Sequence, residues 1–375
     1  MSLPLRRRRD SFTLRRRRTI TLRRRRHPVL RRRRNPGAIV SLFAAVLVAA
    51  TACAPPPPDS ASAEGGAISR TNCGIDVSVA DPPQRIYAAY QPAIELAHAL
   101  GVSDRIVGTA FLDAKVLPEY ADRQADVDYV PSLPSREALL QKKPDFVLSG
   151  FNGFFAEQSA DSSVGTRASL RGVGVQSWIL SPLCPSEDGL TDQSIDPATV
   201  KVENIYRDLR DLGALFGVED KADAVIADMR QRIAAVEKQV ADAERPSVAI
   251  VSPNEDGSYS IASGIDFGSH IIERAGGTNA FADLSRKRNI DVGAEELVKR
   301  DPDVILTDAC CDASMTEQDA RPEVDAILRD PALSGVTAVQ DRAVHPFLFA
   351  DRSAGVRAAH SIELVASVLH PALVD

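Results

Sequence analysis

Five cysteines carry the most reactive side chains of this 375-residue chain. Cys53 follows a run of small residues, and Cys73, Cys184, Cys310 and Cys311 lie further along the chain. If the chain is exported, the last four can pair as disulfides in three ways. A disulfide between neighbouring residues is strained, so we expect Cys310 and Cys311 to remain free thiols.

Metal-binding and catalytic motifs are the next features that could do chemistry. His270, His345 and His360 are scattered, without partners at ligand spacing, so we predict no metal site. The chain has no phosphate loop, no complete GxGxxG, no GxSxG elbow and no HExxH. Ser252 or Ser263 near His270 is a loose candidate for a nucleophile and its base. We predict that the protein is not an enzyme and carries no cofactor, with a surface-anchored hydrolase as the alternative.

Charge is divided unevenly along the chain. Residues 1–52 hold sixteen arginines, in four RRRR blocks, and one acid, Asp10, which gives a net charge of +15. Because the whole chain carries −6, residues 53–375 carry −21. A body this acidic is a poor partner for nucleic acid or for an anionic membrane surface, so we predict no nucleic-acid binding.

The N-terminal segment has the features of an export signal. Residues 37–52 (GAIVSLFAAVLVAATA) are uncharged and mostly apolar, a length typical of a signal peptide behind a basic flank. Ala50-Thr51-Ala52-Cys53 resembles a bacterial lipoprotein cleavage box, and a Pro/Ser/Gly-rich tether follows it. We predict a signal peptide over 1–52, a tether over 53–70, and anchoring to the outer face of the cell membrane through lipidated Cys53. An ordinary secreted protein is the alternative.

Short apolar runs alternate with helical patterns from residue 85 onward. The apolar runs predict strands over 85–90, 104–109, 145–150, 175–180, 247–252, 303–308 and 343–347. The amphipathic segments predict helices over 91–101, 136–144, 165–174, 268–277, 295–302 and 355–370. This alternation favours two α/β lobes, each with a parallel sheet covered by helices.

The segment between the two alternating regions has a different pattern. Over 196–244, apolar residues fall mostly three or four apart, which predicts helix. Gly213 and Gly217 either divide this segment into two helices or bend a single one. We predict an N-terminal lobe over 71–195 and a C-terminal lobe over 245–375, joined by this helical connection.

Four segments, taken in order, resemble a known family. They are RIYAAYQPAIELAHALGVSDRIVGT, PSREALLQKKPDFVLSG, ERAGGTNAFADL and EELVKRDPDVILTD. Over about residues 72–372 the chain resembles the substrate-binding proteins of iron–siderophore and cobalamin ABC importers. The resemblance implies the class III periplasmic-binding-protein fold, in which two Rossmann-like α/β lobes are joined by a long rigid helix. NCG at 72–74 and GTRASLRGVGVQSWILSPLC at 165–184 also resemble an actinobacterial subgroup, which implies a disulfide between Cys73 and Cys184.

The implied ligand cleft lies between the lobes. Open parallel sheets bind ligands at the carboxyl ends of their strands, so we take the cleft residues from those ends. Aromatic side chains offer flat apolar contacts, and arginines suit anionic groups. In the N-terminal lobe we expect Tyr90, Gln91, Phe111, Phe151, Asn152 and Trp178 to line the cleft. In the C-terminal lobe we expect Ser252, Asn254, Arg286, Arg288, Asn289, Asp308, Phe349 and Arg352.

The resemblance also implies how the protein works. A lipid-anchored monomer captures a small molecule in the cleft and delivers it to an ABC permease and its ATPase, without covalent chemistry. Glu137 and Glu295 match the carboxylates that the family presents to permease arginines, and simple capping of their helices is the alternative. The expected ligand is a ferric siderophore, with cobalamin or another corrinoid, a deazaflavin precursor and haem as alternatives. A sensory lipoprotein that has lost transport is a further alternative.

Overall fold

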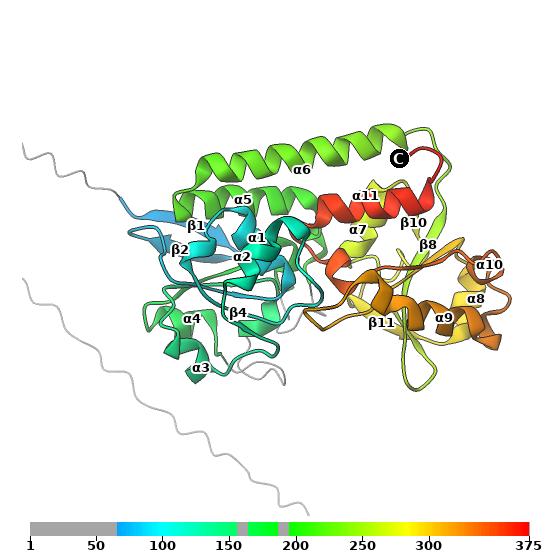
Figure 1. Cartoon of the computed structure of the whole chain (residues 1–375), viewed down its shortest axis with the longest axis horizontal. Coiled ribbons are helices and arrows are strands. Elements are labelled where there is room, and N and C mark those ends of the chain that lie inside the picture. The colour runs from blue at the N-terminus through cyan, green and yellow to red at the C-terminus, as the bar shows by residue number, and fades with distance from the viewer. Residues whose placement is uncertain (1–65, 156–163, 187–194, 375) are drawn as a thin grey trace, which may run out of the picture. The chain divides into compact units, whose positions relative to one another are not determined.

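The computed structural model of the chain describes residues 66–155, 164–186 and 195–374 (Figure 1). Two larger β-sheets with their helices make up most of this part of the chain. The predicted signal peptide over 1–52 and the lipidation site Cys53 lie outside the described residues. None of the helices within the described ranges is long and apolar enough to cross a membrane.

The first sheet holds five parallel strands in the order β5-β4-β3-β6-β7. The strands are β3 (Ile86–Ala89), β4 (Ile106–Ala110), β5 (Tyr129–Val130), β6 (Phe146–Ser149) and β7 (Gln176–Ile179). The α-helices of this lobe are α1 (Gln91–Ala99), α2 (Ala121–Ala125), α3 (Arg136–Gln141) and α4 (Arg167–Arg171). The central strands β3 and β6 are buried at every residue, which is why their sequences are continuous apolar runs.

A short antiparallel hairpin precedes this sheet. It pairs β1 (Ile68–Asn72) with β2 (Ile75–Val79), and Val77 and Val79 of β2 are buried. The prediction of a tether up to residue 70 is therefore wrong at its end, because residues 68–70 already pair with β2. Cys73 lies in the turn of the hairpin and forms a disulfide with Cys184, with 5.3 Å between their Cα atoms. This is the pairing that the family resemblance implied.

The connection between the two sheets consists of two helices, α5 (Val202–Phe216) and α6 (Glu219–Gln239). Gly217 ends α5 with a φ of 67°, a left-handed conformation that turns the chain back. A Cβ atom on Gly213 would lie 2.7 Å from the Cβ of Ala222, so glycine permits the close packing of the two helices. Of the two arrangements that the sequence allowed, two helices is the one observed, and a single helix over 196–244 is not.

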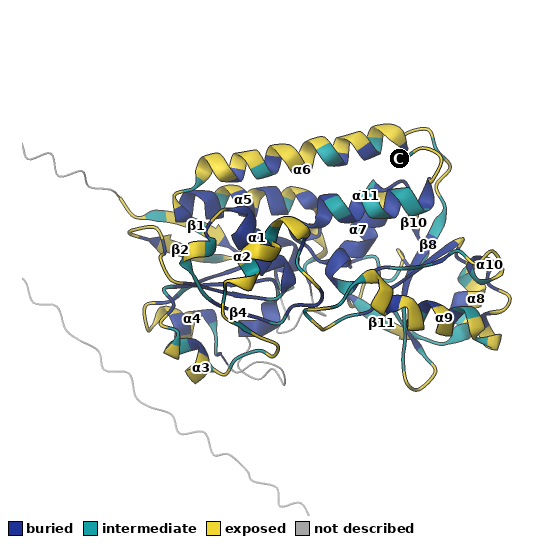
Figure 2. Ribbon diagram, viewed as in Figure 1, coloured by how far each residue is buried: buried dark blue, intermediate teal, exposed yellow. Residues whose placement is uncertain are grey.

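Helix α6 contacts both lobes along its length. It packs on α5 and on α1 of the first lobe, and on α7 (Phe267–Arg274) and α11 (Ala358–Leu369) of the second. In Figure 1 it runs above α5 and continues over α11. Figure 2 shows its outer side exposed and its inner side more buried.

The second sheet is mixed and follows the order β11-β9-β8-β12-β13, with β10 paired to β8. Its strands are β8 (Ser247–Pro253), β9 (Tyr259–Ala262), β10 (Thr278–Asn279), β11 (Asn289–Val292), β12 (Val304–Thr307) and β13 (Val344–Pro346). Besides α7 and α11, its helices are α8 (Ala294–Arg300), α9 (Arg321–Arg329) and α10 (Thr337–Gln340). Strands β8, β12 and β13 are parallel as predicted, whereas β9 and β11 run antiparallel and were not predicted. The predicted α/β fold with two lobes is confirmed.

Buried charges also join the two lobes. Arg357, directly before α11, donates from Nε to a carboxylate oxygen of Glu95 in α1 at 3.1 Å. Its Nη1 donates to Asp351 at 3.0 Å, and its Nη2 donates to the carbonyl of Lys115 at 2.7 Å. Arg357 thus links the second lobe to α1 and to the segment around Lys115 in the first lobe.

Candidate functional site

A pocket with a volume of about 520 Å³ lies where segments of the two lobes meet. Five of the predicted cleft residues line it, namely Tyr90, Phe111, Phe151, Arg288 and Phe349. The other lining residues are Pro92, Asp113, Pro131, Ser132, Leu133, Gly150, Leu183, Cys310, Cys311 and Ser353. The volume is within the usual range for small-molecule sites.

The strands explain why these residues meet. Tyr90, Phe111 and Phe151 come one or two residues after the carboxyl ends of β3, β4 and β6. Cys310 and Phe349 come three residues after the ends of β12 and β13 in the second sheet. Parallel strands bring these ends to one edge of each sheet, which is the usual position of a ligand site in an open α/β sheet.

The wall from the N-terminal lobe is aromatic. The ring centroid of Tyr90 lies 5.2 Å from that of Phe111 and 4.9 Å from that of Phe151. Tyr90 has a φ of 69° and Phe111 a φ of 60°, a left-handed conformation that is unfavourable for aromatic residues. Such strain concentrates at functional sites, where the surrounding structure holds it in place. The two strained residues thus mark this wall as a preorganised apolar surface.

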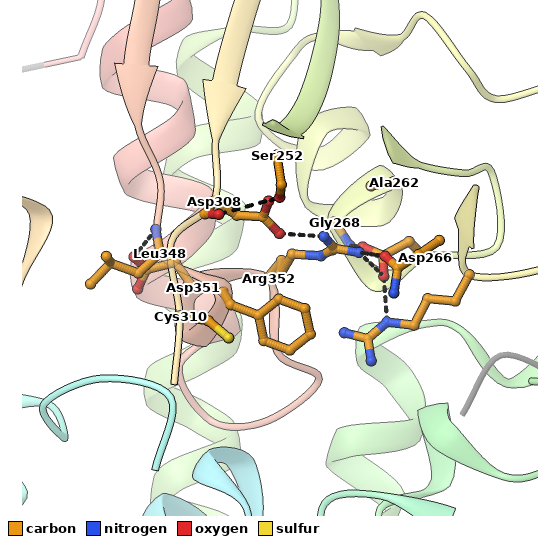
Figure 3. A network of polar contacts seen from close by, with 12 residues as sticks. Ser252, Ala262, Asp266, Gly268, Asp308, Cys310, Leu348, Asp351 and Arg352 are labelled. Carbon is orange, nitrogen blue, oxygen red and sulfur yellow. Dashed lines mark hydrogen bonds and ion pairs between the residues drawn. The ribbon is translucent and has the colours of Figure 1, made fainter. Parts of the chain in front are cut away.

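The wall from the C-terminal lobe carries charges that neutralise one another. Arg352 donates from Nη2 to Asp266 at 2.9 Å and also pairs with Asp308 (Figure 3). Arg288 donates from Nε to the same Asp266 at 2.6 Å. Both guanidinium groups lie over the ring of Phe349, at 5.0 Å for Arg288 and 4.9 Å for Arg352. The ring of Phe349 thus contacts two arginines that carboxylates already hold.

The electrostatics of this wall follow from burial and pairing. Burial alone would raise the pKa of Asp266, but Arg352 and Arg288 hold it below its usual value. Burial would lower the pKa of Arg352, but Asp266 and Asp308 raise it above the ordinary value for arginine. Both partners are thus charged, and carboxylates of the protein balance the positive charge of Arg352.

Several predicted cleft residues support this network instead of lining the pocket. Ser252 donates to the carboxylate of Asp308, the partner of Arg352. Asn289 accepts a hydrogen bond from Arg352 directly. Asn254 lies in the turn after β8, where its backbone N–H donates to the carbonyl of Ser258 at 2.9 Å. None of these three residues lines the pocket, because the network holds Ser252 and Asn289 and the side-chain amide of Asn254 donates to Ser258.

Other predicted cleft residues lie elsewhere. Trp178 is inside β7 and fully buried, and its Nε1 donates to Asp208 at 3.0 Å. Gln91 is also buried, where its side-chain oxygen accepts the backbone N–H of Asp113 at 3.1 Å. Asn152 is buried and donates to the carbonyl of Leu183 at 3.1 Å. Asp308 and Arg352, which belong to the charge network, do not line the pocket either, and Arg286 is exposed outside it.

Ten residues of the pocket were not predicted as site residues, and three of these carry a carboxylate or a sulfur atom. Asp113 is only 3% exposed, and burial raises its pKa to about 7. Cys310 and Cys311 form a disulfide, so the expectation of free thiols is wrong. Cys311 has a φ of 87°, in the left-handed region that favours glycine. The signal that could have found all three is their position just after β4 and β12.

The two glutamates expected to face a permease are both exposed. Glu137 lies in the first turn of α3, and Glu295 lies in the first turn of α8. The neighbour Glu296 pairs with Arg300 at 2.8 Å, which leaves Glu295 as the carboxylate of that turn without such a partner among the described residues. One acidic side chain is therefore presented by each lobe.

The alternative of a hydrolase finds no support in the contacts of its candidate residues. Ser252 donates to Asp308, and the hydroxyl of Ser263 accepts the backbone N–H of Ile265 at 3.2 Å. His270 accepts the backbone N–H of Val202 at 3.2 Å through Nε2. Burial lowers the pKa of His270 to about 4, so it is neutral at pH 7. Within the described residues neither serine is hydrogen-bonded to His270, and the carboxylate that accepts from Ser252 is already paired with Arg352.

Two α/β lobes, a helix that contacts both and a pocket at the strand ends define a substrate-binding protein. Residues 86–345 match the periplasmic binding protein family, and the chain belongs to this family. It is the extracytoplasmic substrate-binding protein of an ABC transporter, not an enzyme.

Three known proteins are similar to the chain. The uncharacterized ABC transporter substrate-binding lipoprotein YvrC of Bacillus subtilis is 25% identical over 67% of this chain and 72% of its own length. A cobalamin-binding protein of Halobacterium salinarum is 25% identical over 63% of this chain, which spans 57% of that relative. A solved structure of an ABC-type Fe3+-hydroxamate transport system from Saccharomonospora viridis has a TM-score of 0.63 at 26% identity, covering 80% of this chain and 98% of that one.

Proposed function

We propose that the protein is a lipid-anchored receptor that captures a ferric siderophore in the pocket and delivers it to an ABC permease. The observation that carries the choice of ligand is the contrast between the aromatic wall and the internally paired arginines. Arg352 is held by Asp266 and Asp308, and Arg288 is held by Asp266, so little positive charge is left for a ligand. The pocket therefore suits a bulky chelate of low net charge.

This argument separates the classes of ferric chelate. Three hydroxamates, each with one negative charge, neutralise Fe3+, whereas three doubly charged catecholates leave a complex with three negative charges. A trianionic chelate needs uncompensated cations in its site, because burying an unpaired charge is costly. The neutral hydroxamate complex needs apolar contacts, which Tyr90, Phe111 and Phe151 offer. The similarity to a protein of an Fe3+-hydroxamate transport system supports the same choice.

Cobalamin is the second candidate ligand. The relative from Halobacterium salinarum is named a cobalamin-binding protein, and a corrinoid would also use the aromatic wall. A corrinoid with its nucleotide arm is larger than a ferric hydroxamate, and a pocket of about 520 Å³ suits the smaller ligand better. Ferric hydroxamate is therefore our first choice.

We propose the same docking role for Glu137 and Glu295 that the resemblance implied. Both carboxylates are exposed, and one lies on each lobe. The protein acts as a monomer in this scheme, with the permease and its ATPase as partners. Substituting both residues by arginine should abolish uptake of a ferric hydroxamate by cells, while binding to the purified protein stays unchanged.

A matched control exists for this charge reversal. Glu219 begins α6 and Glu244 follows it, and both are exposed. In Figure 1 α6 lies at the top of the view, whereas α3 lies at the bottom. Substituting Glu219 and Glu244 by arginine changes the net charge equally but should leave uptake intact. Uptake that survives the substitution at Glu137 and Glu295 would contradict the docking role.

We further propose that Cys53 carries the lipid anchor at the outer face of the cell membrane. The apolar run at 37–52 and the small residues before Cys53 support it, as does the similarity to a lipoprotein. A Cys53→Ala chain should leave the membrane fraction and lose its acyl chains in mass spectrometry. A substituted chain that still fractionates with membranes would contradict the anchor.

A further inference from the structure

The pocket contains a cluster of potential metal ligands that the transport function does not use. The sulfur atoms of Cys310 and Cys311 and a carboxylate oxygen of Asp113 all lie within 4.8 Å of one another. Asp113 follows β4 in the first lobe, and the cysteines follow β12 in the second. The backbone N–H of Cys311 donates to the carbonyl of Asp113 at 3.0 Å, which holds the two segments together. The cluster is thus built across the two lobes.

The carboxylate of Asp113 stands out among the buried acids. Glu95, Asp266 and Asp308 each face an arginine, and Asp208 accepts hydrogen bonds from Trp178 and Ser181. None of the described residues donates a hydrogen bond to the carboxylate of Asp113, although this residue is only 3% exposed and lines the pocket. A buried carboxylate normally has such a partner, so this one points to a ligand that supplies it.

The charges around the cluster favour a cation. Arg288 lines the same pocket but pairs with Asp266 at 2.6 Å. Arg357 is held by Glu95 and Asp351 on the other side. Carboxylates therefore already balance both arginines. Two thiolates and the carboxylate of Asp113 would add negative charge that these arginines do not balance, and this charge favours a cation.

From this geometry we propose that Asp113, Cys310 and Cys311 form a redox-gated site for a soft divalent cation such as Zn2+ or Cd2+. In the oxidised form described here, the sulfurs bond to each other and cannot act as thiolate ligands. A dithiol breaks the S–S bond by giving two electrons and two protons, and is itself oxidised to a disulfide. The cation then displaces both thiol protons and binds two sulfurs and one carboxylate oxygen.

The two disulfides differ in their accessibility to an external thiol. Cys311 is exposed and Cys310 is partly exposed, whereas Cys184 of the other disulfide is buried. Exposed disulfides react with external thiols more readily than buried ones. Three protein ligands also leave one position of a tetrahedral cation open toward the pocket, where water or a transported ligand can bind.

Cadmium is a suitable probe because thiolate-to-cadmium charge transfer absorbs in the ultraviolet. The full chain, kept in detergent, is treated briefly with a dithiol, desalted without oxygen and titrated with Cd2+. We expect a band that saturates at one equivalent in the reduced chain and is absent from the oxidised chain. Cys310→Ser with Cys311→Ser is the matched control, because it keeps Cys53, Cys73 and Cys184. A band that persists in this control, or a reduced chain without a saturable band, would overturn the proposal.

The role of Asp113 is tested separately. Asp113→Asn keeps the size of the side chain but removes its charge, so the reduced chain should bind Cd2+ about tenfold more weakly or worse. Thermal unfolding of the oxidised forms checks that the substituted chain is folded. Equal affinities would remove Asp113 from the site. In the unsubstituted chain, Cd2+ should also protect both thiols from iodoacetamide, and unprotected thiols would contradict the site without any substitution.

Discussion

The two walls of the pocket are built on opposite principles. The wall from the N-terminal lobe consists of Tyr90, Phe111 and Phe151, whose rings contact one another and whose surface is apolar. The wall from the C-terminal lobe presents Phe349 above Arg288 and Arg352, whose charges are balanced by carboxylates. The first wall presents aromatic rings to the pocket, whereas the charges of the second wall are balanced within the protein.

This difference teaches how charged residues at a pocket should be interpreted. Two arginines near a cleft suggest an anionic ligand, but the pairing with Asp266 and Asp308 gives them a structural role. The aromatic residues are not neutralised in this way, because apolar surface is stabilised only by being covered. Binding energy is thus expected from the first wall and rigidity from the second.

Breaking the charge network should have the largest effect. Arg352→Met would leave Asp266 and Asp308 short of a partner in a buried position, and should lower the free energy of unfolding by about 3–5 kcal/mol. Urea unfolding of the full chain in detergent measures this change. Arg286→Met is the control, because Arg286 is exposed, and its effect should stay within about 0.5 kcal/mol. Equal stabilities for the two variants would show that the network is not structural.

The ionisation of Asp113 should have the next largest effect. Burial raises its pKa to about 7, so between the unfolded value of 3.8 and pH 7 the folded state binds a proton that the unfolded state has lost. Its contribution to stability is therefore full below pH 3.8 and is lost as the pH rises through 7. Asn cannot ionise. Between pH 5 and pH 8 the free energy of unfolding of Asp113→Asn should therefore rise by roughly 3 kcal/mol relative to that of the unsubstituted chain.

Urea unfolding at the two pH values, in buffer freed of metals, measures this gain. Arg286→Met serves as the control again, because its stability relative to the unsubstituted chain should not depend on pH over this range. The free energy of unfolding of Asp113→Asn is compared with that of the unsubstituted chain. If the difference is the same at pH 5 and pH 8, Asp113 is charged over this whole range.

Truncating the aromatic wall should have the smallest effect on the protein but a clear one on binding. Phe151→Ala removes one ring of the wall, and should weaken binding of a ferric hydroxamate about tenfold, equivalent to about 1.4 kcal/mol. Calorimetric titration of the full chain measures the affinity. Arg286→Ala, outside the pocket, should bind as the unsubstituted chain does. Unchanged affinity in Phe151→Ala would place the ligand elsewhere.

Much of the fold could be predicted because the buried strands have strong local signals. Strands such as β3, β6 and β12 are buried on both faces, so they read as apolar runs with helices between them. Strands β9 and β11 have the same length but were missed because they are not fully buried and lack such apolar runs. The antiparallel part of the second sheet depends on pairing between distant residues, which a local pattern does not contain.

The sequence could predict the pocket residues that come shortly after the ends of strands. Tyr90, Phe111, Phe151 and Phe349 follow the carboxyl ends of parallel strands and line the pocket. Trp178 was misplaced because it lies inside β7, one residue before its end, where every side chain but the first is buried.

The remaining features of the site depend on contacts between the lobes. Asp113 and Cys311 are joined by a hydrogen bond across almost two hundred residues of sequence, so their proximity could not be inferred from either segment. The pairing of the arginines is equally a tertiary property, because Asp266 and Arg352 lie far apart in the chain.

The most direct test of the transport account is a calorimetric titration of the full chain in detergent with three ligands. They are a ferric tris-hydroxamate siderophore, a ferric tris-catecholate siderophore and cobalamin. We predict saturable one-to-one binding of the hydroxamate, with a raised melting temperature, and weaker binding of cobalamin and of the trianionic catecholate. Preference for the catecholate, or no binding of any of the three, would contradict a pocket that selects neutral chelates through its aromatic wall.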